Sequence, residues 1–167
     1  MVWVFIIVAI IVFVLIIFNT DKTAEKEKIQ RIGLDKLYPN FIMYIESQSN
    51  YGDQALGMGM PELVIKAGSK MEYKRNVHPQ RQYIGDFHFS INHLFKGFIE
   101  THFITKYGVK IKGYIVEIKN GLDERDVDSY EELMFKMLTD IFKLPEFKKY
   151  VSQLENMDDF VNDISSL

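Results

Sequence analysis

The sequence predicts an α+β domain, a small antiparallel sheet with helices packed on one face, preceded by one N-terminal transmembrane helix. Three observations lead to this expectation. The first 18 residues are apolar throughout, the middle of the chain holds short segments of alternating apolar and polar side chains, and the last third carries apolar residues at helical spacing. A period of two is typical of strands and a period near 3.6 of helices. Strands followed by a run of helices favour an α+β arrangement.

The N-terminal segment 1–18 contains no charged residue, no proline and no glycine. As a helix it would be roughly 27 Å long, close to the thickness of the hydrocarbon core of a bilayer. A secretory signal peptide is the main alternative, but such a signal has a positive start and small residues at its cleavage site. Neither is present, so we expect residues 1–18 to be an uncleaved anchor that contacts the lipid bilayer.

Basic residues follow this apolar segment and none precedes it: Lys22, Lys26, Lys28 and Arg31. Positive flanks remain on the cytoplasmic side of membranes. We therefore expect a single-pass membrane protein whose soluble domain faces the cytoplasm. The alternative orientation would make it an extracytoplasmic binding or immunity-type domain.

Residues 19–38 read as a stalk or linker helix, with Pro39 as its expected stop, and residues 39–167 as the soluble domain. Gln48–Pro61 is rich in Ser, Asn, Gly and Asp, a composition typical of a loop. A connection of this length is long for a compact domain, and long loops often carry function.

The sheet is expected from four segments. Leu63–Lys66 and Met71–Arg75 flank a Gly-containing turn and predict a hairpin, residues 83–92 alternate strictly, and Val109–Lys119 forms a further strand. Between the last two, we expect Asn92 to cap a helix that runs to Tyr107 and ends at Gly108.

The C-terminal part is predicted to be helical. Ser129 and Glu132 form a capping box, and the following apolar residues share one helix face: Leu133, Met137, Leu138, Ile141 and Phe142. Pro145 is expected to open a second helix to about Leu154, and Met157–Ile164 a short third one.

Composition excludes several functions. The chain has no cysteine, which rules out disulfides, thiolate metal sites and a cysteine nucleophile. The net charge of −3 combines a weakly basic part before Gly121 with an acidic part after it. Such a division indicates neither a nucleic acid nor a specific protein as partner.

One short motif resembles a nuclease. Ile115 to Lys119 is an apolar strand that ends in Glu-x-Lys, and it resembles the third core strand of PD-(D/E)xK nucleases. The resemblance implies a Mg²⁺ ion bound by Glu117 and a water activated with help from Lys119. The family also needs an upstream aspartate, for which Asp86 is the nearest residue. The resemblance covers five residues, and the alternative is a solvated strand face with weak ion pairs.

Three histidines fall within fifteen residues, which raises the question of a metal site. His93 and Glu100 would share one face of the helix expected to start at Asn92, and they are the candidate ligands. No recognised ligand spacing surrounds them. We expect His88 and His102 to border the core and to titrate normally.

The leading functional hypothesis is a membrane-tethered, non-enzymatic binding or regulatory module that acts on another protein at the membrane. It follows from an anchor joined to a domain without a convergent catalytic set. A membrane-anchored metal-dependent nuclease is the second hypothesis. The acidic tail after Gly121 and the loop Gln48–Pro61 are the surfaces expected to meet a protein partner, whereas binding to nucleic acid is not expected.

Overall fold

The computed structural model describes residues 2–48, 57–94, 96–118, 127–154 and 160. Its elements are listed here in chain order. They are helices α1 (Val2–Ile32), α2 (Leu34–Leu37) and α3 (Pro39–Gln48), strands β1 (Glu62–Ala67) and β2 (Lys70–Val77), the 3-10 turn η1 (Pro79–Arg81), strands β3 (Gly85–Leu94), β4 (Lys96–Thr105) and β5 (Lys110–Ile118), and helices α4 (Val127–Phe142) and α5 (Pro145–Val151). The predicted α+β class is confirmed.

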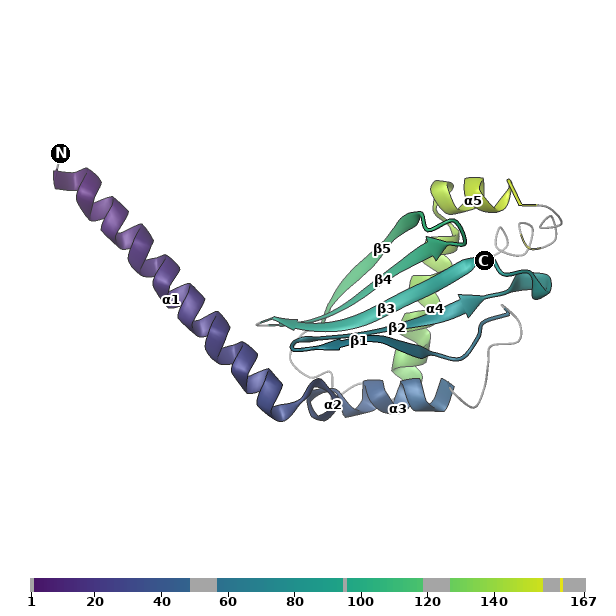
Figure 1. Ribbon diagram of the computed structural model, residues 1–167, viewed down its shortest axis with the longest axis horizontal. Helices are drawn as coiled ribbons and strands as arrows, with labels where there is room; N and C mark the ends of the chain where they lie inside the picture. The colour runs from purple at the N-terminus through teal and green to yellow at the C-terminus, as the bar shows by residue number, and fades with distance from the viewer. Residues whose placement is uncertain (1, 49–56, 95, 119–126, 155–159, 161–167) are drawn as a thin grey trace.

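Helix α1 projects away from the rest of the molecule (Figure 1). Its segment Trp3–Asp21 is long and apolar enough to cross a membrane, and none of that segment is buried. A signal sequence near an N-terminus meets the same criteria of length and composition. The structure is therefore consistent with either a membrane span or a signal sequence. It does not show on which side of a membrane the domain lies.

Gly33 ends helix α1. Its φ of +87° lies in the left-handed region that glycine occupies without strain, and its N–H bonds to the carbonyl of Ile29 at 2.7 Å. The helix expected to run to Tyr38 is therefore interrupted at Gly33 and resumes as α2, which ends at Leu37, just before Pro39, as predicted. Pro39 also begins α3, because a proline at the first helical position removes an N–H that has no partner there.

The five strands form one antiparallel sheet in the order β1-β2-β3-β4-β5. Each strand pairs with its neighbour in sequence, so the sheet is a simple meander. The predicted hairpin of β1 and β2, the alternating strand and the last strand are all found, within a few residues of their expected ends. The sheet and the helices that cross it are seen in Figure 1.

Strand β4 corrects one prediction, the helix from Asn92 to Tyr107. Burial alternates along β4 with every second residue inside, and Asn92 lies in β3, where its amide donates to Glu100 at 3.0 Å instead of capping a helix. The apolar residues of this segment fit both periods. Pairing with the two neighbouring strands β3 and β5 favours the strand over the helix. The chain reverses direction between β3 and β4, since Leu94 pairs with Lys96.

The core lies between one face of the sheet and the helices α3, α4 and α5. Its largest fully buried side chains are aromatic: Phe41, Phe89, Phe103, Tyr130, Phe142 and Phe147. The predicted apolar face of the C-terminal helix is present, since Met137, Leu138, Ile141 and Phe142 are buried and Leu133 is partly buried. The helix already includes Val127, however, so Ser129 is not its cap.

The segment predicted as a stalk contributes to this core. Ile29, Leu34 and Tyr38 are all buried within it. Ile29 and Leu34 lie beside Gly68 and Met71 at the β1–β2 hairpin. The C-terminal end of α1 is thus packed against the domain.

Candidate functional site

The face of the sheet that points away from the helices is polar. Successive residues of a strand point to opposite faces, so Phe87, Phe89 and Ile91 enter the core while His88 and Ser90 lie on the other side. His88 pairs directly with His102 across β3 and β4. Glu72 on β2 pairs with Ser90, which places it diagonally beside His88.

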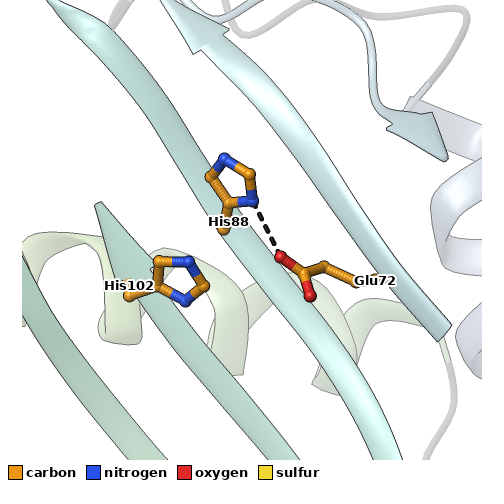
Figure 2. Close-up of side chains that lie close together, drawn as sticks. All are labelled: Glu72, His88 and His102. Atoms are coloured by element: carbon orange, nitrogen blue, oxygen red, sulfur yellow. Dashed lines mark hydrogen bonds and ion pairs between the residues drawn. The ribbon is translucent and has the colours of Figure 1, made fainter. Parts of the chain in front are cut away.

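Glu72, His88 and His102 form a cluster on this face (Figure 2). The Nδ1 atom of His88 lies 2.9 Å from Oε1 of Glu72. The two imidazole rings stack nearly parallel with centroids 4.8 Å apart. Glu72 and His88 are buried, although no described helix covers this face. Charged residues are seldom buried without a partner, so the cluster is unusual.

Lysines surround the cluster. Nζ of Lys70 lies 2.5 Å from the second carboxylate oxygen of Glu72. Burial raises the pKa of Glu72, but the hydrogen bonds with Lys70 and His88 outweigh it and hold the pKa below the usual value. Burial, assisted by the charge of Lys110 and by His88, lowers the pKa of His102 to about 4. His102 is therefore neutral at physiological pH, and the expectation that it titrates normally is wrong.

The residues of the nuclease motif lie far apart. Asp86 pairs with Ile104 of β4, whereas Glu117 pairs with Phe98 of the same strand. Six residues of β4 separate these positions, about 20 Å along the strand. Nζ of Lys96 bonds to Glu117 at 2.7 Å, and Lys119 lies outside the described residues. The structure does not bring Asp86 and Glu117 together, so the motif gains no support from the fold.

The predicted metal ligands His93 and Glu100 also do not converge. His93 lies on the core side of the sheet, where its Nδ1 atom contacts the hydroxyl of Tyr38. Glu100 lies on the polar face and accepts a hydrogen bond from Asn92. Successive residues of a strand point to opposite faces of a sheet. The predicted helix had placed His93 and Glu100 on one face, whereas the sheet places them on opposite faces.

A groove of about 730 Å³ lies between the β4–β5 hairpin and α5. Its size is in the range of small-molecule sites. Its lining is mostly apolar, with Ile111, Tyr114 and Leu144, and Lys110 and Lys149 also contribute to it. The groove is open to solvent on one side, and its residues offer no convergent set of polar groups.

Two surfaces expected to meet a partner lie partly outside the described residues. They are the loop Gln48–Pro61, of which residues 49–56 fall outside, and parts of the acidic tail, residues 119–126, 155–159 and 161–167. The predicted short helix Met157–Ile164 falls almost entirely among them. A comparison of the chain with protein-family models, with curated proteins and with solved structures found no match.

Proposed function

We propose that this chain is a single-pass membrane protein whose α+β domain binds another protein at the membrane surface. The observation that carries the proposal is the contrast within helix α1. Its apolar half, from Trp3 to Phe18, is exposed along its whole described length, whereas Ile29 near its other end is buried in the domain. Leaving so many large apolar side chains in water is unfavourable by roughly 25 cal/mol per Å², and lipid removes that cost.

The junction supports a tether that positions the domain. Ile29 and Leu34 are buried in the core and line a small pocket together with Gly68 and Met71 of the β1–β2 hairpin, so the helix enters the domain without a free linker. Asp21, at the end of the apolar segment, precedes Ile32 by eleven residues, about 16 Å of helix. In this proposal the hairpin end of the sheet therefore lies near the bilayer, and the far end of the strands points away from it.

Strand β1 supports a protein as the partner. It is an edge strand, hydrogen-bonded only to β2 among the described strands, and all six of its residues are exposed. Leu63, Val64 and Ile65 place three consecutive apolar side chains there, with Val64 44% exposed. An apolar edge of this kind accepts an extended segment of another protein as an additional strand. We propose that this edge is the docking surface.

We further propose that the domain faces the cytoplasm, because the basic residues Lys22, Lys26, Lys28 and Arg31 follow the apolar segment. A reporter enzyme that is active only in the cytoplasm, fused after Leu167, is expected to be active. Activity of a reporter that works only outside the cytoplasm would instead favour the extracytoplasmic binding or immunity-type alternative.

Membrane association is tested by high-speed centrifugation of cell extracts without detergent. The full-length chain is expected in the pellet, and detergent is expected to release it. A variant with Ile7→Arg and Ile11→Arg should move to the supernatant, because each charge at the centre of a span costs about 2.5–3.5 kcal/mol. The matched control carries the same two arginines at Thr20 and Thr23, which are exposed and lie at or beyond the end of the apolar segment. A native chain that stays in the supernatant, or one that begins near Asp21 by mass spectrometry, would overturn the tether.

The docking edge is tested by photo-crosslinking in cells. A photoreactive residue at Leu63 should give a discrete crosslinked product, and a second substitution, Ile65→Lys, should abolish it by placing a charge on the edge. A probe at Ile115, an exposed apolar residue on the opposite edge strand β5, is the control and should give no such product. Equal products from both probes, or none from Leu63, would argue against β1 as the docking surface.

A further inference from the structure

We propose that Glu72, His88 and His102 form a binding site for a divalent transition-metal ion of the zinc class. Each side chain offers one ligand atom, and these atoms all lie within 4.8 Å of one another. The three residues come from the adjacent strands β2, β3 and β4, so the sheet fixes their spacing (Figure 2). No ligand comes from the tether or from the edge strand β1, although Ile65 of β1 pairs directly with Glu72.

The ligand spacing is close to that of a bound ion. Zinc lies about 2.0–2.1 Å from its nitrogen and oxygen ligands, so neighbouring ligand atoms around a tetrahedral ion are about 3.4 Å apart. The nitrogen of His88 and the oxygen of Glu72 are 2.9 Å apart, slightly closer than that. The widest pair, at no more than 4.8 Å, must approach by about 1.5 Å at most. Rotation of the half-buried His102 side chain covers such a distance.

His102 is the ligand free to move. Its ring is half-buried, and among the described residues its nitrogens make no hydrogen bond. It is held only by stacking on His88. Its imidazole nitrogens, to which the described residues supply no hydrogen bond, are the atoms that an incoming cation would use.

Lys70 is the competitor in the absence of metal. Its ammonium occupies the second oxygen of Glu72 at 2.5 Å, and a bound cation would take over part of that role. The lysine side chain is 34% exposed, and its four-carbon stem lets the ammonium turn towards solvent. Metal binding therefore exchanges one cation for another at Glu72, which limits the affinity.

The donor set selects the class of ion. Two imidazoles and one carboxylate suit zinc, copper, iron or nickel, whereas magnesium prefers oxygen ligands and retains most of its water. Three protein ligands leave at least one coordination position open, as in zinc sites that bind a water molecule or a further ligand. The position would face solvent on the side of the sheet away from the helices.

The test uses the full-length chain in detergent micelles, without a polyhistidine tag and after treatment with a chelator. Isothermal titration with Zn²⁺ is expected to show one ion per chain, and Co²⁺ to give the visible absorption of a tetrahedral site. His102→Gln should weaken binding at least about tenfold, and Lys70→Met should tighten it. His78→Gln is the matched control, because His78 is partly buried but lies outside the cluster, and it should leave binding unchanged.

The design distinguishes a site from weak surface binding. Zinc binding that is absent, or that is reduced equally by the His102 and His78 substitutions, would overturn the proposal. Binding of Mg²⁺ at the same strength as Zn²⁺ would also contradict it. Circular dichroism of each variant checks folding. His102→Gln is the deciding variant, because the ring of His102 is half-buried and makes no hydrogen bond among the described residues, so its removal is expected to leave the sheet intact.

Discussion

Both faces of the sheet contain buried side chains, but the neighbours of these side chains differ in polarity. On the helix side, Phe87, Phe89 and Ile91 are buried among other apolar side chains, and Phe89 contacts the rings of Phe41 and Tyr73. On the other side, Glu72 and His88 are buried as well, but against polar neighbours. Packing supplies stability without any specific partner, whereas a buried carboxylate needs its own hydrogen bonds. The difference separates the face that holds the fold together from the face with residues suited to binding.

The largest expected effect is on the helix face. Phe89→Ala removes a fully buried ring from the centre of the core, and we expect the free energy of unfolding to fall by about 3–5 kcal/mol. Urea unfolding followed by circular dichroism measures the change. A loss below about 1 kcal/mol would mean that this face is not the densely packed one, and that the comparison between the faces is wrong.

Glu72→Ala tests the polar face. It leaves the buried ring of His88 without its hydrogen-bond partner and Lys70 without its counter-ion, and the expected loss of stability is about 1–3 kcal/mol in metal-free protein. Glu62→Ala is the control, since Glu62 forms a similar pair with Lys74 but its side chain is 66% exposed. That variant should lose less than about 1 kcal/mol. Equal losses in the two variants would show that burial of Glu72 adds nothing.

The end of the polar face near Asp86 is expected to respond to alkaline pH. Burial and a hydrogen bond to Asp86 raise the pKa of Tyr83 to about 12, from 10 in the unfolded chain. The neutral phenol therefore stabilises the fold below pH 10, and this contribution is lost as the pH rises towards 12. Tyr83→Phe should lose less stability than the native chain between pH 9 and pH 12 in thermal unfolding. Identical pH profiles would show that Tyr83 titrates alike in the folded and unfolded chains.

The helix-side face was more readily predicted from the sequence than the polar face. Apolar alternation around Phe87 and Phe89 and the helical spacing around Met137 and Ile141 predicted strand β3 and the apolar face of helix α4, which both contribute to the core. Such patterns report which residues avoid water. They therefore describe the packed face well.

The cluster on the polar face was missed for one reason. Residues 96–105 fit a helical period as well as an alternating one, and the helix prediction removed β4 from the sheet. His102 then had no position opposite His88, although the correct register pairs them directly. Glu72 lies sixteen residues before His88, and only strand pairing brings the two together. Tertiary pairing of this kind has no local signal.

The smallest effect is expected at the exposed end of the polar face. Glu117 forms an ion pair with Lys96 in which the side chains are 42% and 62% exposed. Solvent screens such pairs, so Glu117→Ala should change the free energy of unfolding by less than about 0.5 kcal/mol, as measured by urea unfolding. The same variant bears on the nuclease resemblance, since cleavage of DNA with Mg²⁺ that depended on Glu117 would require a partner carboxylate other than the distant Asp86. A stability loss above about 1 kcal/mol would place Glu117 with the buried cluster, and the polar face would then be one continuous network and not a small buried site within a solvated surface.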